Sequence, residues 1–436
     1  MRRLCGALAA AMLQLVGSTN SHIAAAHKAQ KTCPLATMPV ALAAGASEFE
    51  WAAAEELALW AGRVGGRAAP LEVVDAAAVG AKPHFAVGFG AALAAGVSAA
   101  QLSPDKLGNE GFMASSVHAP GVVVLSGAPN ATRGALYAGY HYLWLLGVRF
   151  LAENATIVPS CPVTGLPIVN ETNWRPAFEY RAVNSWAALA DPLQAQRLHL
   201  NDGAHLVSAS DSVGARQPAP VPALPAAITS PYANGYFVHS IYTLLQAPPI
   251  NGGPRQGPGP PTALFNSHRE WFWPRDAGPA VGGQVCWSNA SLVAQLILAT
   301  KGVLRGQPDA RIMSISQNDN LEQCKSPEEL AVIAEEQSPA GPLLRAINAI
   351  AEAIAEEFPL VAIDTLAYTY NAPAPLLTKV RPNVIVRLCV GDASAPVDFL
   401  RPFASEANRP FRAQLQDWRE KANATRLFVW NYVCDF

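Results

Sequence analysis

Alternating apolar runs and amphipathic segments predict a small α/β domain over residues 38–152. Ser47 and Glu50 are spaced as a capping box, and apolar residues then recur at helical spacing until Gly65 and Gly66 end the helix. A second amphipathic helix is expected from residue 130 to 147. The runs expected as strands of this domain are 38–44, 85–89, 112–117, 122–125 and 148–151.

A second pattern follows a proline-containing linker at residues 153–176 and occupies residues 177–436. Helical segments at 292–305 and 342–358 separate some of its apolar runs. This β-α alternation predicts a (β/α)8-type TIM barrel, so the chain as a whole is expected to be α/β. The runs expected as its strands are 178–183, 205–207, 236–241, 311–316, 361–366, 384–388 and 427–433.

A closed barrel of this type needs eight strands to leave no open edge, and the pattern supplies seven. The barrel is therefore expected to be truncated after its seventh strand, or to be closed by an insertion or a partner. The stretches 208–234 and 246–264 are rich in Pro, Gly and Ala, and we interpret them as surface insertions.

The charge and the apolar content of the chain limit the classes of partner that it can bind. The formal net charge is −2 and only 15% of residues are charged, so no basic excess is present to bind a nucleic acid. Residues 1–26 resemble a secretory signal peptide, with Arg2 and Arg3 ahead of a 13-residue apolar run at 4–16. A membrane anchor or a mitochondrial presequence is the alternative. No later run is long enough for a membrane span.

A secreted protein is expected to carry glycans and disulfides, and the chain contains the glycosylation sequons and the cysteines from which both form. The Asn-x-Ser/Thr sequons lie at Asn130, Asn154, Asn170, Asn289 and Asn423. Six cysteines follow the signal, which permits three bridges in fifteen pairings. The alternative is that Cys286, Cys389 and Cys434 are buried thiols. No zinc-type spacing, nucleotide loop or Gly-x-Ser-x-Gly motif occurs, so we expect no metal and no cofactor.

Catalytic groups of barrels lie at the carboxyl ends of strands. Five polar residues follow the fourth expected strand there, and Asp319 among them is the candidate general acid. Its neighbours Gln317, Asn318 and Asn320 are candidates for binding substrate hydroxyls. The alternative is an Asx-rich turn before the next helix. Such an acid needs a second carboxylate.

Asp435 after the seventh strand and Asp392 after the sixth are the candidates for the second carboxylate, as base or nucleophile. Asp364 lies inside an apolar strand and could be structural. Arg387, also inside an apolar strand, needs an acidic partner or an anionic ligand, so it is expected to pair with Asp319 or to hold a substrate carboxylate.

His239 ends the third expected strand, where it could bind a sugar hydroxyl or be a hydrogen-bonded structural residue. Aromatic residues lie near strand ends and loops, and aromatic rings stack against the apolar faces of sugars. About half of them are expected to be core instead. They are Trp271, Trp273, Trp287, Tyr368, Tyr370, Trp430 and Tyr432, of which Tyr368, Trp430 and Tyr432 are the substrate-binding candidates.

The motif Gly-Asn-Glu-Gly-Phe at 108–112, with segments 132–140 and 146–150, resembles the domain that precedes the barrel in alpha-glucuronidases and bacterial-type beta-hexosaminidases. Later segments resemble a large uncharacterised family of barrel domains that is joined to it. The matching segments are 178–181, 314–320, 338–345, 364–368, 383–389 and 429–432.

This resemblance implies a glycosidase-like barrel with its fourth-strand acid near Asp319. The chain departs from those relatives in three ways: only Cys324 stands where they carry a cysteine pair, Asn431 stands where they often have Asp, and they continue through an eighth strand. The leading hypothesis is a secreted glycoside hydrolase acting on a polysaccharide or glycan, with uronic-acid-containing glycans as one candidate class. The alternatives are a non-catalytic carbohydrate-binding protein on a degenerate or truncated barrel, and a structural extracellular module.

Overall fold

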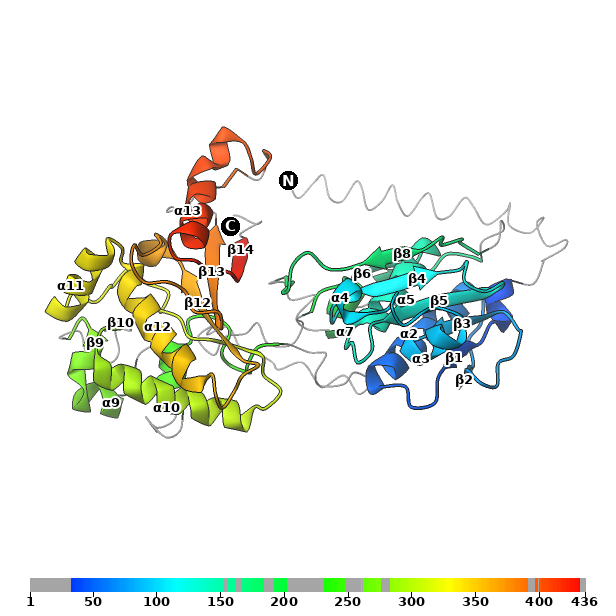
Figure 1. Cartoon of the computed structure of the whole chain (residues 1–436), viewed down its shortest axis with the longest axis horizontal. Helices are drawn as coiled ribbons and strands as arrows, with labels where there is room; N and C mark the ends of the chain where they lie inside the picture. The colour runs from blue at the N-terminus through cyan, green and yellow to red at the C-terminus, as the bar shows by residue number, and fades with distance from the viewer. Residues whose placement is uncertain are drawn as a thin grey trace, which may run out of the picture. The chain divides into compact units, whose positions relative to one another are not determined.

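The computed structural model divides the chain into two compact units, residues 1–176 and 177–436 (Figure 1). Each unit has its own apolar core, and each is described by itself below. The residues that the structure describes are 33–152, 155–161, 166–183, 192–201, 231–247, 260, 262–275, 283–390, 397–398 and 400–431.

The first unit is built on a mixed six-stranded sheet. The neighbouring strands β2, β1, β3 and β5 run parallel, while β4 and β8 follow antiparallel at the end of the sheet. A separate hairpin pairs β6 with β7. The strands are β1 (Val40–Leu42), β2 (Val73–Asp75), β3 (His84–Val87), β4 (Phe112–Ser115), β5 (Val122–Gly127), β6 (Arg149–Ala152), β7 (Ala155–Ile157) and β8 (Thr172–Trp174).

The helices of this unit begin where the sequence provides a cap. The capping box at Ser47 and Glu50 is present at the start of α2, and Glu50 also accepts a 2.6 Å hydrogen bond from the amide of Phe89, which starts α3. The expected helix at 130–147 is α5. The helical elements are η2 (Pro34–Thr37), α2 (Glu48–Val64), α3 (Phe89–Ala94), α4 (Pro104–Leu107) and α5 (Gly134–Leu145).

Part of the segment expected to be a linker belongs to the sheet. β7 and β8 both lie within residues 153–176, and β8 pairs with β4 through Ala114 and Thr172. These strands are three residues long and half-exposed, so they carry no apolar run from which they could be predicted.

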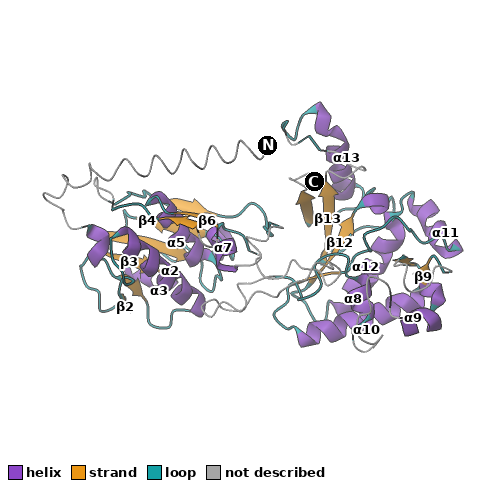
Figure 2. Cartoon of the chain, turned by 180° about the vertical axis from the view of Figure 1, so that it is seen from behind, coloured by secondary structure: helices purple, strands orange, loops and turns teal. Residues whose placement is uncertain are grey.

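The second unit contains a four-stranded parallel sheet in sequential order, β11-β12-β13-β14, which confirms the α/β class. Its larger helices α10 and α12 pack together beside the sheet (Figure 2). A two-stranded sheet of β9 and β10 lies apart from it. The strands are β9 (Phe272–Trp273), β10 (Gln284–Val285), β11 (Ile312–Ser314), β12 (Ala362–Ala367), β13 (Val384–Val390) and β14 (Leu427–Asn431).

The helices of this unit match the expected segments at 292–305 and 342–358, which are α10 and α12. Asn289 caps α10, because its side chain accepts from the amide of Leu292 at 3.1 Å. The helical elements are α7 (Pro192–Arg197), α8 (Ile241–Leu245), α9 (Thr262–Ser267), η4 (Arg269–Trp271), α10 (Ala290–Gly306), α11 (Pro327–Glu336), α12 (Ala340–Ile354), η5 (Thr369–Asn371), η6 (Glu406–Asn408) and α13 (Arg409–Glu420).

Among the described residues no closed barrel is seen, and two of the strands expected for the truncated barrel are wrong. Residues 178–183 form a loop in which Arg181 bonds to Asn201 instead of to a neighbouring strand. Residues 236–241 cannot extend as a strand, because His239 adopts a left-handed φ of 46° and α8 begins at Ile241. Just before them, Tyr232 forms a single parallel bridge to β11. The expected strand 205–207 and the signal segment 1–26 lie outside the described residues.

The two faces of the parallel sheet have different chemistry, because side chains alternate along each strand. One face presents Met313, Ile363 and Val386 to the apolar core that the helices share. The other presents Ser314, Asp364 and Arg387, which are fully or almost fully buried, beneath aromatic side chains. A polar layer therefore lies inside the unit, next to the strand ends at which the candidate site is found.

Two disulfides join Cys33 to Cys161 and Cys286 to Cys324. The interpretation of Cys286 as a buried thiol is therefore wrong. Cys389 is buried in β13, and Cys434 lies outside the described residues. Two disulfides are typical of an extracellular or secreted protein. In the part of the chain that the structure describes, no helix has the length and apolar character needed to cross a bilayer.

Candidate functional site

Asp319 and Tyr368 meet at the carboxyl edge of the parallel sheet. Asp319 follows β11 and Tyr368 follows β12, which are adjacent strands. The Tyr368 hydroxyl donates a 2.9 Å hydrogen bond to Oδ1 of Asp319, and the Asp319 side chain is exposed. The sequence placed both residues in the candidate site, and the structure brings them together.

His239 lies beside this pair. Its Nδ1 is 2.8 Å from the carbonyl oxygen of Gln317, and its ring centroid is 5.8 Å from that of Tyr368. A carbonyl oxygen only accepts hydrogen bonds, so Nδ1 must carry a proton. In the neutral ring, Nε2 is then an acceptor. His239 is thus both hydrogen-bonded to the scaffold and able to accept a hydrogen bond from a ligand.

The backbone is strained on both sides of this contact. His239 has φ 46° and Thr369, which follows Tyr368, has φ 52°. Residues with side chains rarely occupy this left-handed region, and they are found there mainly when surrounding contacts enforce it. Such strain is concentrated at functional sites, which supports this edge as the candidate site.

Gln317 is fully buried beneath the pair. Its Nε2 donates to Oδ1 of Asn371 at 2.9 Å, and the same oxygen accepts from the amide of Tyr368. Oε1 of Gln317 and Nδ2 of Asn371 have no hydrogen-bond partner within the described ranges. Gln317 was expected to bind substrate hydroxyls; in the structure its amide nitrogen is used to hold the turn that carries Tyr368.

Asn318 and Asn320 bond to the segment around β10. Asn318 Nδ2 donates to the carbonyl of Gly283 at 2.7 Å, and Gln284 Nε2 donates to Oδ1 of Asn320 at 3.0 Å. Asn320 Oδ1 also accepts from the amide of Glu322, as in an Asx turn. The structure therefore brings these two candidates to β10 and not to the Tyr368 hydroxyl.

Arg387 pairs with Asp364 and not with Asp319. Its Nη2 and Nε lie 2.5 and 3.1 Å from Oδ2 of Asp364, which also accepts a 2.6 Å bond from the Tyr232 hydroxyl. Burial opposes the charge of Arg387, but attraction to Asp364 holds its pKa above the ordinary value. Burial also opposes the charge of Asp364, and it raises the pKa of this carboxyl although Arg387 and the hydrogen bonds act to lower it. An arginine stays charged even when buried, so Arg387 requires the acidic partner that Asp364 provides.

Trp430 and Phe237 enclose the guanidinium of Arg387, whose central carbon lies 5.8 and 4.4 Å from their ring centroids. Arg387 and Trp430 thus belong to an aromatic cluster on the inner face of the sheet. Trp271 and Trp287 are core residues. Burial raises the pKa of Tyr370 well above its usual value. The candidates Asp392, Asp435 and Tyr432 lie outside the described residues.

Sequence reasoning missed Gln284 and Glu329. Gln284 is a single polar residue in a short apolar run, which gave no signal by itself. Glu329 follows Ser326 by three residues, and Ser326 caps α11 by accepting from the amide of Glu329 at 3.2 Å. That Ser-x-x-Glu spacing could have been recognised as a helix start. Among the described residues no His, Cys, Asp and Glu cluster could hold a metal.

The chain belongs to the family described as a domain of unknown function, DUF4838, whose model matches residues 150–436. No curated protein matches the chain. A solved structure with some similarity is endo-glycoceramidase II from Rhodococcus sp., in a cellobiose-like imidazole complex, with 13% identity and a TM-score of 0.21. The alignment covers 46% of this chain and 42% of that one, so the chain spans less than half of that protein's length. Similarity of this degree supports no argument about activity.

Proposed function

We propose that this chain is a secreted glycoside hydrolase that acts on a polysaccharide or glycan, with Asp319 as the general acid. The observation that carries the proposal is the 2.9 Å hydrogen bond from Tyr368 to Asp319 at the carboxyl edge of a parallel sheet, beside His239. Active sites of barrel-type α/β enzymes form at this edge. The Tyr368 hydroxyl holds the Asp319 carboxyl in one orientation at this edge, and a general acid must be positioned in this way toward the glycosidic oxygen.

The geometry divides the two oxygens of Asp319 between two roles. Oδ1 accepts from Tyr368, which fixes the orientation of the carboxyl group. Oδ2 would deliver the proton to the departing oxygen, and His239 Nε2 would accept a hydrogen bond from a sugar hydroxyl. The positioned acid by itself accounts for about 10²–10⁴-fold of such a reaction.

The second carboxylate is proposed to be Asp392 or Asp435. β13 ends at Val390, two positions before Asp392, and β14 ends at Asn431, four positions before Asp435. Both strands run parallel to β12, so their carboxyl ends meet at the same edge as Tyr368. The resemblance to alpha-glucuronidases makes uronic-acid-containing glycans the first substrates to test.

The test is Asp319→Asn, with Asp309→Asn as its control. Asp309 is an exposed aspartate that precedes β11, at the opposite end of the same strand. On aryl glycosides and glucuronoxylan fragments, Asp319→Asn should lower kcat by about 10²-fold or more while glycan affinity changes little, because only the proton donor is removed. Asp309→Asn should keep wild-type rates. Undiminished turnover by Asp319→Asn would rule out its assignment.

A carbohydrate-binding protein without turnover is the second candidate. It is favoured by the hydrogen bonds of Asn318 and Asn320 to the segment around β10, which hold these side chains in the scaffold. A wild-type chain that releases no sugar from a broad glycan panel, yet binds one of its members, would establish this function instead.

A further inference from the structure

We propose that Gln284 is a positioning residue for Asp319, an inference that rests on the proposed function. Gln284 lies in β10, 35 positions before Asp319 in the chain, and its side chain is fully buried. Among the described residues the hydrogen bonds of its side chain go to Asn318 and Asn320, so its effect on the site must pass through the segment that carries Asp319.

The side chain of Gln284 holds the residues on both sides of Asp319. Its Oε1 accepts from the amide of Asn318 at 3.0 Å, and its Nε2 donates to the carbonyl of Asn318 at 2.8 Å. The same Nε2 reaches the carbonyl of Asn320 at 3.2 Å and its Oδ1 at 3.0 Å. One amide group therefore fixes both residues that flank the candidate acid.

This arrangement uses the two halves of a carboxamide for different partners. Only a side chain with a donor and an acceptor side by side can satisfy an amide N–H and a carbonyl at once. Without the carboxamide of Gln284, the amide N–H and the carbonyl of Asn318 would each lose a hydrogen-bond partner, at a cost of about 1–3 kcal/mol for each group. The backbone around Asp319 is therefore held by directional bonds and not by apolar packing.

A disulfide and a second glutamine support this interpretation. Cys286, two positions after Gln284, is bonded to Cys324, so the two segments are also joined covalently. At the other end of β11, Gln307 accepts from the amide of Asn234 at 2.6 Å and donates to its carbonyl at 3.3 Å. Gln307 thus makes the same kind of bond away from the site, and it provides a matched control.

The first test compares Gln284→Met with Gln307→Met. Methionine keeps the length of the side chain but removes both hydrogen-bonding groups. In Gln284→Met, deuterium exchange in the peptide 316–322 should become about tenfold faster, because the Asn318 amide loses its acceptor. On the glycoside that the wild type hydrolyses best, kcat should fall about 10–100-fold with KM within about threefold. Gln307→Met should change neither quantity.

The second test uses Gln284→Glu and keeps the proposal testable if the methionine variant does not fold. A protonated carboxyl has one donor and one acceptor, as the carboxamide has, whereas an ionised carboxyl has no donor. The kcat of Gln284→Glu relative to wild type should therefore rise as pH falls. A residue with no positioning role would show no such pH-dependent rescue.

The outcomes separate this inference from the proposed function. Wild-type kcat in Gln284→Met, in an enzyme that Asp319→Asn inactivates, would overturn the positioning role. If Asp319→Asn retains turnover, or if no glycoside is hydrolysed, the proposed function fails. Deuterium exchange alone then tests whether Gln284 holds the segment around Asp319. Exchange that is faster only in Gln284→Met supports the inference, and exchange equal to wild type overturns it.

Discussion

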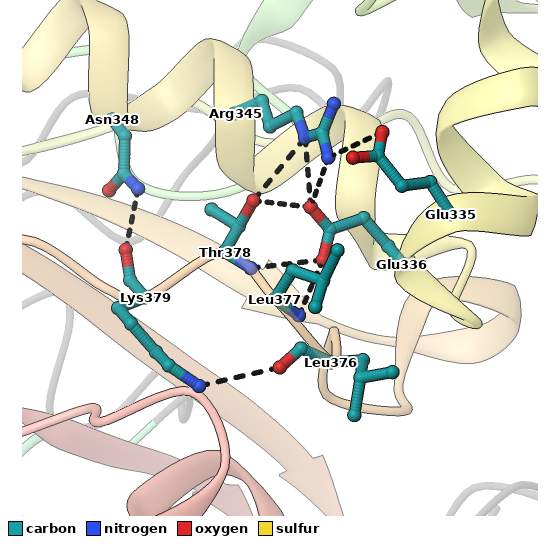
Figure 3. A network of polar contacts seen from close by, with 8 residues as sticks. All are labelled: Glu335, Glu336, Arg345, Asn348, Leu376, Leu377, Thr378 and Lys379. Atoms are coloured by element: carbon teal, nitrogen blue, oxygen red, sulfur yellow. Dashed lines mark hydrogen bonds and ion pairs between the residues drawn. The ribbon is translucent and has the colours of Figure 1, made fainter.

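Two buried glutamates in α11 respond to pH in opposite directions. Glu336, at the end of the helix, accepts bonds from Arg345, from the Thr378 hydroxyl and from the amides of Leu377 and Thr378 (Figure 3). Burial would raise the pKa of Glu336, but these bonds together lower it to about 2. They also fasten the connection from β12 to β13, whose described residues contain η5 and no α-helix.

Glu336→Gln should destabilise the protein at pH 7 by about 3 kcal/mol, because the amide keeps only one of the two acceptor oxygens and loses the negative charge that faces Arg345. Since the folded pKa lies below the ordinary value, the contribution of Glu336 is present above about pH 4.5 and is lost as pH falls toward 2. Urea denaturation at pH 7 and pH 3 should show the variant and wild type converging. Glu335→Gln, at an exposed side chain paired with the same arginine, should change stability by less than about 1 kcal/mol.

Glu329, near the start of α11, behaves in the reverse way. Burial raises its pKa to about 7, although the amide of Ser288 donates to it at 2.7 Å. Because the folded pKa exceeds the ordinary value, its contribution is present below about pH 4.5 and is lost as pH rises through 7. Glu329→Gln should therefore gain up to about 3 kcal/mol over wild type at pH 8 and nothing at pH 4.

Urea denaturation at pH 4, 6 and 8 measures this gain. Glu328→Gln is the control, since Glu328 is the exposed neighbour in the same helix turn. An identical pH profile for Glu329→Gln and wild type would contradict the assignment of a buried, protonated carboxyl at this position.

At the scale of elements, close backbone packing decides where α5 lies in the first unit. A Cβ added to Gly134, the first residue of α5, would stand 2.4 Å from the carbonyl oxygen of Gly111 and 2.6 Å from the Cα of Gly127. Those glycines lie next to or within β4 and β5. Two of the glycine-containing motifs of the first unit, 108–112 and 132–140, thus meet at a contact that allows no side chain.

Gly134→Ala should cost about 1–3 kcal/mol, because α5 or the strands must shift to admit a methyl group. Gly139→Ala is the matched control in the same helix. There the nearest atoms to an added Cβ lie 3.9 Å away, so the better helix propensity of alanine should leave stability unchanged or raise it by up to about 1 kcal/mol. Thermal unfolding of both variants measures the difference, and equal losses would contradict the packing argument.

At the scale of the whole molecule, the two units each have a core and a disulfide of their own. Cys33–Cys161 lies within the first unit and Cys286–Cys324 within the second. Folding is usually cooperative within a domain, so each unit is expected to unfold as its own thermodynamic unit.

Calorimetry of the full chain should therefore resolve two transitions. Gly134→Ala should lower the Tm of one of them by a few degrees, and Glu336→Gln should lower the Tm of the other, since about 1 kcal/mol corresponds to about 2–4 °C for units of this size. A single transition that both variants shift would show that the units unfold together.

Local patterns were sufficient for several of the longer helices and strands. α2, α10 and α12, and the strands β11 to β14, were predicted because helical periodicity, caps and apolar runs are properties of neighbouring residues. The prediction of a barrel truncated after its seventh strand counted 178–183 and 236–241 as strands from apolar content alone. The left-handed φ of His239 and the contacts of Arg181 are set by residues elsewhere in the chain.

The candidate site was predicted only in part, for the same reason. Asp319 and Tyr368 were recognised because strand ends are visible in the sequence. His239 was chosen from an expected strand that does not form, yet the structure brings these three residues together. The expected pairing of Arg387 with Asp319 is wrong, because the structure pairs Arg387 with Asp364, 23 positions earlier. The amide bonds of Gln284 were missed, because a single buried glutamine has no periodic signature.

By itself, the sequence determined the α/β class, the helices and strands with strong periodicity, and the strand-end position of Asp319. Only the tertiary structure decided the four-stranded sheet, the Cys286–Cys324 pairing, the Arg387–Asp364 ion pair and the hold of Gln284 on the residues around Asp319. Periodicity records whether a position faces a core or solvent. The choice of partner across tens of residues depends on which surfaces pack together and on which buried polar groups must then be satisfied.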